Sequence, residues 1–295
     1  MTLSLKQSYA WCKTLSRRRA GNFYFSFLTL PADRFRDMCA LYAFMRICDD
    51  LGDDEHLSAT IRAANLDAWH ASLTRALDGE SFDHELFPAL AEMVHRTGIP
   101  REYLFAVIEG VRTDLQPVGF ETFAELTDYC YHVAGAVGLC CIHIWGFHDD
   151  RATERAIDCG IAFQLTNILR DLAEDAAMGR LYLPREDLRR FGYSADDIVA
   201  RCVDDRFLKL MQFEVARAET YYDRAAELLA YLDPPGRPIY AAMLNIYGGL
   251  LKGIKRRGYN VYAGRIKLSR LRKLAIALGA MLKYRWWPHR SRDET

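Results

Sequence analysis

The feature that most constrains the fold is a helical spacing of apolar residues, which runs through almost the whole chain. In segment 35–48, Phe35, Met38 and Leu41 recur at intervals of three, and Met45 follows four residues later. This spacing places them on one face of an α-helix. Similar patterns cover 60–77, 84–97, 101–113, 121–147, 151–175, 205–232, 238–255 and 267–284. Because alternating strand patterns are scarce, we predict an all-α chain of roughly ten helices.

Proline and glycine interrupt the helical pattern at short intervals. The breaks fall at Pro31, 98–100, 116–119, 179–184 and 233–238, where these residues end helices. None of the breaks is long enough for an interdomain linker. Hydrophobic residues make up 51% of the chain, which is ample for one large core. We therefore predict a single domain over 1–295, with 252–295 as its C-terminal segment.

The formal charge of the chain is zero, because 39 basic residues face 39 acidic ones. This balance argues against a protein that coats nucleic acid generally and against a solvated acidic tail. The charges are nevertheless unevenly placed. Segment 252–295 holds 13 basic and 2 acidic residues, which leaves 26 basic and 37 acidic residues in 1–251. A functional interpretation must account for this division.

The cysteines and the N-terminus favour a cytoplasmic location. None of the eight cysteines forms a C-x-x-C pair, and several lie in apolar helical patterns. These positions are typical of reduced residues in a core. The first 19 residues are polar, aromatic and basic, without the apolar stretch of a signal peptide.

A segment without Asp, Glu, Lys or Arg covers 129–147. It contains His132, His143 and three glycines, so we predict a buried helix rather than a membrane span. A zinc site is a competing interpretation of this segment, since Cys130, Cys140 and Cys141 lie near the two histidines. Their spacing, however, matches no zinc finger or knuckle.

An acidic cluster follows the apolar helix predicted over 35–48. It reads Asp49-Asp50-Leu51-Gly52-Asp53, and Asp49 and Asp53 are four residues apart, so on a helix they share one face. Gly52 is expected to weaken the end of this helix. Two anions on one face repel each other unless a cation lies between them.

A second acidic cluster repeats the arrangement within 167–175. Asp171 and Asp175 share a face, with Asn167 one turn earlier and Gln164 near it. Carboxylate pairs on two helices suit Mg²⁺, which prefers oxygen ligands and is commonly completed by substrate phosphate and water. Solvated acidic helix ends are the alternative. Two such pairs beside apolar segments favour a metal–diphosphate site.

Arginines accompany both acidic clusters. Arg46 lies three residues before Asp49, and Arg170 directly precedes Asp171. A guanidinium can bind phosphate oxygens in bidentate fashion. We therefore expect both arginines to contact a phosphorylated substrate.

Together these motifs resemble the squalene/phytoene synthase family, the head-to-head trans-isoprenyl diphosphate synthases. The resemblance covers about residues 7–275 and rests on motifs in the family's order. The motifs are the aromatic segment 22–27, Tyr42-x-x-x-Arg46-x-x-Asp49-Asp50-x-x-Asp53, the helix 129–138, Gln164-x-x-Asn167-x-x-Arg170-Asp171-x-x-x-Asp175, and 179–184. In detail the chain is most similar to bacterial presqualene diphosphate and squalene synthases.

The resemblance implies an isoprenoid synthase fold, a single helical domain around a central cavity. Two or three Mg²⁺ ions with diphosphate would be held by Asp49, Asp53, Asp171 and Asp175. The implied substrate-binding residues are Phe23, Phe27, Arg46, Val133, Val137, Gln164, Asn167, Arg170 and Arg265. The implied catalytic residues are Tyr42, Arg46, Tyr129, Asn167 and Tyr247.

The implied reaction joins two farnesyl diphosphates. Mg²⁺ helps one diphosphate to leave, and the allylic cation is attacked by the second chain to give presqualene diphosphate. Reduction by NADPH would lead on to squalene, but the sequence leaves NADPH use open. Phytoene synthesis from two geranylgeranyl diphosphates is the alternative.

Two further classes of protein share part of this pattern. A catalytically silent helical scaffold would have the same helices, but the intact Asp pairs argue against it. A terpene cyclase would use the same metal chemistry, but it lacks the Tyr-x-x-x-Arg and Gln-x-x-Asn spacings. The motifs therefore favour the head-to-head synthases over both.

The basic C-terminus has three interpretations: a nucleic-acid arm, a solvated tail, or a segment at a membrane surface. No nucleic-acid-binding fold is recognisable. The apolar run 274–282 is preceded by Arg272 and Lys273 and followed by Lys283 and a Trp286–Trp287 pair. This pattern favours anionic lipid headgroups. We expect a peripheral association with the inner face of the membrane, near downstream isoprenoid enzymes.

Overall fold

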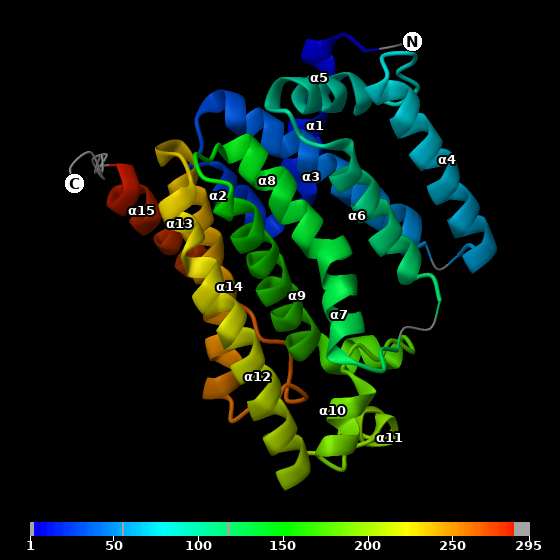
Figure 1. Ribbon diagram of the computed structural model, residues 1–295, viewed down its shortest axis with the longest axis vertical. Coiled ribbons are helices and arrows are strands. Elements are labelled where there is room, and N and C mark those ends of the chain that lie inside the picture. Colours follow the sequence, from blue (N-terminus) through cyan, green and yellow to red (C-terminus); the bar gives the residue numbers. More distant parts are fainter. Residues whose placement is uncertain (1–2, 55, 117–118, 286–295) are drawn as a thin grey trace.

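The computed structural model describes residues 3–54, 56–116 and 119–285 of the chain, and the described residues form one helical domain (Figure 1). The longer helices are α1 (Leu5–Arg19), α3 (Ala32–Gly52), α4 (Ala59–Leu77), α5 (Phe87–Thr97), α6 (Arg101–Thr113), α8 (Ala136–Trp145), α9 (Arg151–Ala177), α12 (Asp205–Ala226), α14 (Arg237–Arg256) and α15 (Arg270–Arg285). The shorter ones are α2 (Gly21–Phe27), α7 (Phe123–Cys130), α10 (Arg185–Arg190), α11 (Ala195–Val199) and α13 (Leu228–Tyr231), with a π-helix η1 (Tyr131–Gly135) and a 3₁₀-helix η2 (Pro234–Gly236).

The all-α prediction is confirmed. Among the described residues the β-structure amounts to two isolated bridges, Gly119 with Leu181 and Phe147 with Leu232. The helix predicted over 121–147 is α7, η1 and α8 in succession, and the one predicted over 205–232 is divided into α12 and α13. The helices α1, α2, α10 and α11 lie outside the predicted segments. The last three have only five to seven residues, which show too little of the helical period.

The long helix α9 runs through the middle of the domain (Figure 1). It packs against α8 and η1 on one side and against α12 and α14 on another. Helix α3 packs against α1, α5, α6 and α8, while α15 packs on α14 and α2. This arrangement turns one face of α3 and one face of α9 toward the same interior space.

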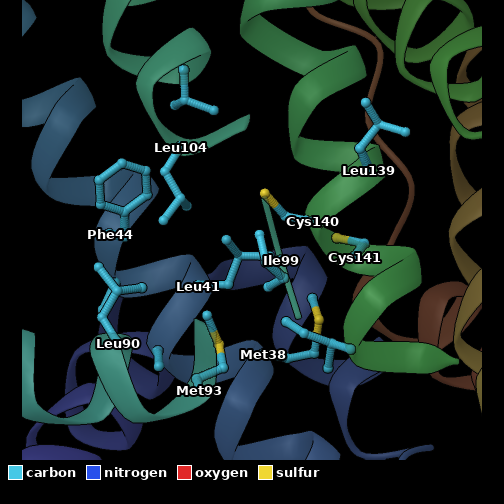
Figure 2. Packing of buried hydrophobic residues seen from close by; sticks show 14 of the residues in the cluster. Met38, Leu41, Phe44, Leu90, Met93, Ile99, Leu104, Leu139, Cys140 and Cys141 are labelled. Atoms are coloured by element: carbon cyan, nitrogen blue, oxygen red, sulfur yellow. The ribbon is translucent and has the colours of Figure 1, made fainter. Parts of the chain in front are cut away.

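A dense apolar core supports α3 and α8 (Figure 2). Leu41 and Phe44 of α3 and Cys140 of α8 are fully buried. Each large side chain removed from water in this way stabilises the fold by about 1.5–3 kcal/mol. Cys140 and Cys141 have free thiols, and Figure 2 shows them among Met38, Leu139 and Ile99. They therefore act as packing residues, as the sequence predicts.

Three glycines bring the helices around η1 unusually close together. A Cβ on Gly160 of α9 would lie 2.5 Å from the carbonyl carbon of Ala134, and one on Gly110 of α6 would lie 2.7 Å from Val133. One on Gly138 of α8 would lie 2.7 Å from a backbone oxygen of α9. The π-helix is thus clamped between α6 and α9.

No helix within the described ranges is both long and apolar enough to cross a membrane. The uncharged segment 129–147 instead forms buried helix, with Leu139, Ile142 and Trp145 at most 3% exposed. Its apolar character is explained by packing between α6 and α9.

Candidate active site

A polar cavity of about 430 Å³ lies between the C-terminal end of α3 and the C-terminal half of α9. Its wall is completed by the chain after α6 and by the segment after α9. The lining carries five carboxylates and two guanidinium groups. These charged residues are Asp49, Asp53, Asp114, Asp171, Asp175, Arg170 and Arg180.

The first predicted aspartate pair closes α3. Asp53 follows the last helical residue, and its backbone N–H donates to the carbonyl oxygen of Asp49 at 2.8 Å. A Cβ on Gly52 would lie 2.4 Å from Val111, so the glycine allows α3 to end against α6. The expected weakening at Gly52 therefore does not move Asp53 away, and both carboxylates line the cavity.

The second pair lies on one face of α9, as the four-residue spacing predicts. Asp171 and Asp175 line the cavity together with Asn167 and Gln164, which precede them on the same face. The Asn167 amide donates to the Gln164 side-chain oxygen at 3.4 Å. The two aspartate pairs thus reach one cavity from two different helices.

The electrostatics of the cavity favour a bound cation. Burial raises the pKa of Asp49 from 3.8 to about 7, and the neighbouring carboxylates of Asp53 and Asp50 add to this against the opposing charge of Arg46. Burial, with the charge of Asp171, likewise raises the pKa of Asp175 to about 7. Five carboxylates against two arginines leave a surplus of negative charge, which costs free energy unless a cation offsets it.

The residues present fit magnesium better than zinc. The three cysteines of the zinc alternative, Cys130, Cys140 and Cys141, are free thiols buried in the apolar core. The donors around the cavity are carboxylate oxygens, which suit Mg²⁺ completed by phosphate and water. Asp49 and Asp53 on one wall and Asp171 and Asp175 on the other are the residues that would hold it.

Arginines are paired with the acidic groups around the cavity. The guanidinium of Arg170 contacts the Asp171 carboxylate through two nitrogens. Arg265, a substrate-binding residue implied by the family resemblance, lies 3.0 Å from Asp171 and 3.2 Å from Glu174. Arg180 lies 3.5 Å from Asp53. A bound diphosphate could take these guanidiniums as partners in place of the carboxylates.

Arg46 does not line the polar cavity with Asp49 and Asp53. Its guanidinium pairs with Asp50, and its side chain lines the apolar cavity described next. Asp50 itself lines neither cavity. Within the first motif, Asp50 therefore pairs with an arginine, whereas Asp49 and Asp53 line the polar cavity.

The polar cavity continues into an apolar cavity of about 380 Å³. The two share Asp49, Val111, Asp114, Tyr129, Gln164 and Asn167. The predicted residues that line the apolar part are Phe27, Tyr42, Val133, Val137 and Tyr247. The side chain of Phe23 lies outside the described part of the structure.

The two helices that carry the aspartate pairs, α3 and α9, both change from polar to apolar lining residues toward their N-termini. On α3 the lining passes from Asp49 to Tyr42 and Met38, and on α9 from Asp171 to Ala156. At about 1.5 Å per residue, the α9 wall is about 22 Å long. The far end is closed by Trp145 and Tyr240, whose ring centroids are 6.1 Å apart. The shape suits a molecule with a charged head and a long apolar tail.

The tyrosines of the cavity remain neutral. Burial and the charge of Asp114 raise the pKa of Tyr129 well above 10. Burial raises the pKa of Tyr247 to about 12, opposed by Arg170 and a hydrogen bond with Asn167. The Tyr247 ring stacks on Phe163 at a centroid distance of 4.1 Å. Neutral aromatic faces can stabilise a carbocation.

Three residues of the site were not predicted. Asp114 follows α6 outside any motif, so the sequence carried no signal for it. Arg180 and Tyr182 belong to the 179–184 motif, which did indicate this segment without assigning roles. The hydroxyls of Tyr129 and Tyr182 both donate to the Asp114 carboxylate, so Asp114 connects α7 to the segment after α9.

Comparison with known proteins agrees with this geometry. Residues 16–272 match the family model described as squalene/phytoene synthase. The chain is 35% identical over 293 residues to 15-cis-phytoene synthase of Synechococcus elongatus, covering 95% of this chain and 94% of the relative. It is 34% identical to 15-cis-phytoene synthase of Synechocystis sp., covering 95% and 86%.

Solved structures show the same fold. A dehydrosqualene synthase in complex with a ligand has a TM-score of 0.87 at 27% identity, covering 96% of this chain and 98% of the other. Squalene synthase HpnC from Alicyclobacillus acidocaldarius has a TM-score of 0.82 at 32% identity, covering 87% and 96%. The cavity, the motifs and these matches together place the chain in the squalene/phytoene synthase family, whose prenyltransferases join two prenyl diphosphates head to head.

Proposed function

We propose that the protein condenses two molecules of farnesyl diphosphate head to head, giving presqualene diphosphate. The observation that carries the proposal is one cavity with two ends. Its acidic end has two pairs of aspartates on facing helices, and its apolar end is closed by aromatic side chains. A prenyl diphosphate has the same division between charged head and hydrocarbon tail.

The diphosphate groups would lie at the acidic end. Arg170, Arg180 and Arg265 would contact their oxygens, and Asn167 and Gln164 would orient them from α9. When bound through Asp49, Asp53, Asp171 and Asp175, Mg²⁺ would neutralise the charge that develops on the departing diphosphate. Arg46 would hold the second substrate where the two cavities meet.

In the proposed reaction, the C1–O bond of one substrate breaks and releases pyrophosphate. C1 of this ionised substrate then forms bonds to C2 and C3 of the other substrate and loses one proton, which the released pyrophosphate can accept, as the cyclopropane closes. The other substrate keeps its diphosphate. Tyr42, Tyr129 and Tyr247 would face the transient cation without trapping it, because their neutral hydroxyls are weak nucleophiles. The apolar wall would keep water away from it.

The proposed length of the substrate's prenyl chain rests on the closed apolar end of the cavity and on the similar solved structures. Trp145 and Tyr240 are buried at 3% and 1% exposure, and the similar solved structures are squalene-type synthases. The closed end limits the length of the chain that fits, and the squalene-type structures support farnesyl chains. The curated relatives are phytoene synthases, which favours a second candidate, the condensation of geranylgeranyl diphosphate. Continuation to squalene would need a hydride donor such as NADPH.

One experiment tests substrate and product together. Purified protein is incubated with Mg²⁺ and either farnesyl or geranylgeranyl diphosphate, with and without NADPH, and the lipids are identified by mass spectrometry. The proposal expects presqualene diphosphate from farnesyl diphosphate. Conversion of geranylgeranyl diphosphate alone would support the second candidate, and no conversion of either substrate would refute both.

A further inference from the structure

Helix α15 has apolar residues on two opposite faces. The face turned toward α14 carries small or half-buried residues, with Ala277 and Ala280 packed against Ala241 and Ala242. The opposite face carries large leucines in contact with solvent. Their exposed fractions are 80% for Leu271, 39% for Leu274, 51% for Leu278 and 70% for Leu282.

The four leucines form one stripe. With 3.6 residues per turn, they fall within an arc of about 80° around the helix axis. A surface helix of a globular protein normally turns its large apolar residues inward and its polar residues outward. In α15 Ala277 and Ala280 point inward and the four leucines outward, so this stripe has no partner within the described domain. Such a continuous apolar surface marks an interaction site.

The charges around the stripe indicate what covers it. Arg270 lies on one side of the leucines, and Arg272 and Lys283 lie on the other, at the angles set by the helical period. Between positions 252 and 285 the sequence has eleven basic and no acidic residues. A leucine stripe between rows of basic side chains complements an anionic lipid surface, where leucines enter the acyl boundary and cations meet headgroups.

Acidic residues near α15 lie to one side of the stripe. Glu219 and Asp223 of α12 line the groove between α12, α14 and α15, together with Lys252. Glu219 is already paired with Lys255 at 2.6 Å. Arg272 and Lys283 line the same groove, so the two carboxylates face one basic border of the stripe from the protein side, whereas Arg270 on the other border does not line the groove. Arg272 and Lys283 are nevertheless exposed to solvent.

The position of α15 links this surface to the candidate active site. Helix α15 packs on α14 and α2, and these helices supply Tyr240, Met243 and Phe27 to the apolar cavity. In Figure 1, α15 forms the left edge of the domain beside α14. We propose that the leucine stripe of α15 docks the enzyme onto an anionic bilayer. In this orientation the apolar end of the cavity lies near the bilayer. The benefit of docking rests on the proposed function, because the bilayer would then receive the lipid product.

The test is flotation of the full chain with vesicles, in the absence of substrate. One vesicle population is phosphatidylcholine alone, and the other contains added phosphatidylglycerol. The variant Leu271→Glu/Leu278→Glu/Leu282→Glu replaces three of the four exposed leucines. The variant Arg270→Glu/Arg272→Glu reverses the charge on both sides of the stripe. Val199→Glu on α11, at a residue that is 67% exposed, and Lys209→Glu on α12 are matched controls. Leu278→Glu alone replaces the triple variant if the latter fails to fold.

We expect the wild type and both controls to float with the anionic vesicles and not with phosphatidylcholine alone. In the stripe and border variants the fraction of protein bound to vesicles should fall at least tenfold, while the circular dichroism spectrum keeps its helical shape. Conversion of prenyl diphosphate in detergent should stay unchanged in these variants, so failure of docking is distinguished from failure of the proposed chemistry.

Three results would overturn the proposal. The first is a wild-type protein that does not float with anionic vesicles, and the second is a stripe variant that floats as well as the wild type. The third is a wild-type dimer that the stripe variant converts to a monomer in light scattering, which would identify a second copy of the chain as the occupant of the stripe.

Discussion

The hydroxyl oxygen of Tyr129 lies 3.1 and 3.0 Å from the two carboxylate oxygens of Asp114, and the hydroxyl of Tyr182 donates to the same carboxylate at 2.9 Å. The two tyrosine rings are stacked at a centroid distance of 5.3 Å. Asp114 therefore fixes two aromatic rings where the acidic and apolar cavities meet. Hydrogen bonds to a charged acceptor are stronger than neutral ones.

Replacing Asp114 should therefore slow the reaction without unfolding the protein. Asp114→Asn keeps the shape but removes the charge, and a hydrogen bond to a charged group contributes about 1.5–3 kcal/mol. We expect product formation to fall about 10- to 100-fold, since each decade corresponds to about 1.4 kcal/mol. Steady-state kinetics of Asp114→Asn, Tyr129→Phe and the double variant should show non-additive losses. Fully additive losses would contradict the coupling.

The aspartates that face the cavity should matter far more than those beside them. Asp49→Ala and Asp171→Ala each remove a carboxylate proposed to hold Mg²⁺, and we expect conversion to fall by about 10²–10³ or more, the scale of losing an electrostatic contact in an active site. Asp54→Ala is the matched control, because Asp54 hydrogen-bonds the backbone of His56 and lines neither cavity. Conversion that survives Asp49→Ala and Asp171→Ala would exclude these residues as the metal site.

Magnesium binding should depend on pH through Asp49 and Asp175. Because the pKa of each is raised to about 7, the stability that these groups contribute in the metal-free protein is present at acidic pH and is lost as pH rises through about 7. Their ionised forms would bind Mg²⁺. The rise in melting temperature caused by Mg²⁺ with pyrophosphate should therefore be larger at pH 8 than at pH 6.

Pyrophosphate also titrates in this range, so the comparison needs a variant. In Asp175→Asn one of the two titrating carboxylates is absent, and the difference between the melting-temperature shifts at pH 8 and pH 6 should be smaller than in the wild type. Identical pH dependence in the two proteins would show that the aspartate does not control binding.

The size of the apolar cavity should control the length of the accepted chain. Met243 of α14 is half-buried and lines this cavity one turn from Tyr247. Met243→Ala should increase the conversion of geranylgeranyl relative to farnesyl diphosphate, and Met243→Trp should decrease it. Competition between the two substrates, read by mass spectrometry, measures the ratio. An unchanged ratio in both variants would place the chain ends elsewhere.

A buried ion cluster outside the cavity should contribute more to the free energy of unfolding than exposed ion pairs do. Arg217 lies 2.7 Å from Asp187 and 2.8 Å from Glu214, and both carboxylates are almost fully buried. Arg217→Met would leave two buried acids without their cation, which costs about 3–5 kcal/mol of unfolding free energy. Arg206→Ala, which breaks exposed pairs, should cost about 0–1 kcal/mol. Urea denaturation measures both, and equal losses would contradict the role of burial.

Local patterns predicted much of this protein because they depend on short-range geometry. The apolar period of three and four indicated helices, and a separation of four placed Asp49 with Asp53 and Asp171 with Asp175. The sequence could not locate the π-helix Tyr131–Gly135, because its apolar spacing is that of an ordinary helix. That segment depends on the close approach of Gly110 and Gly160 from two other helices.

The sequence by itself determined the helical class, the two aspartate faces and the family resemblance, since each is built from patterns that repeat or lie within a few turns of a helix. The tertiary structure alone decided that these faces share a cavity, that Asp114 joins two tyrosines, and that Arg265 reaches Asp171 across 94 residues of chain. It also decided which face of α15 is outside. The physical reason is that helix spacing fixes which side chains share a face, whereas packing between distant helices fixes what that face meets.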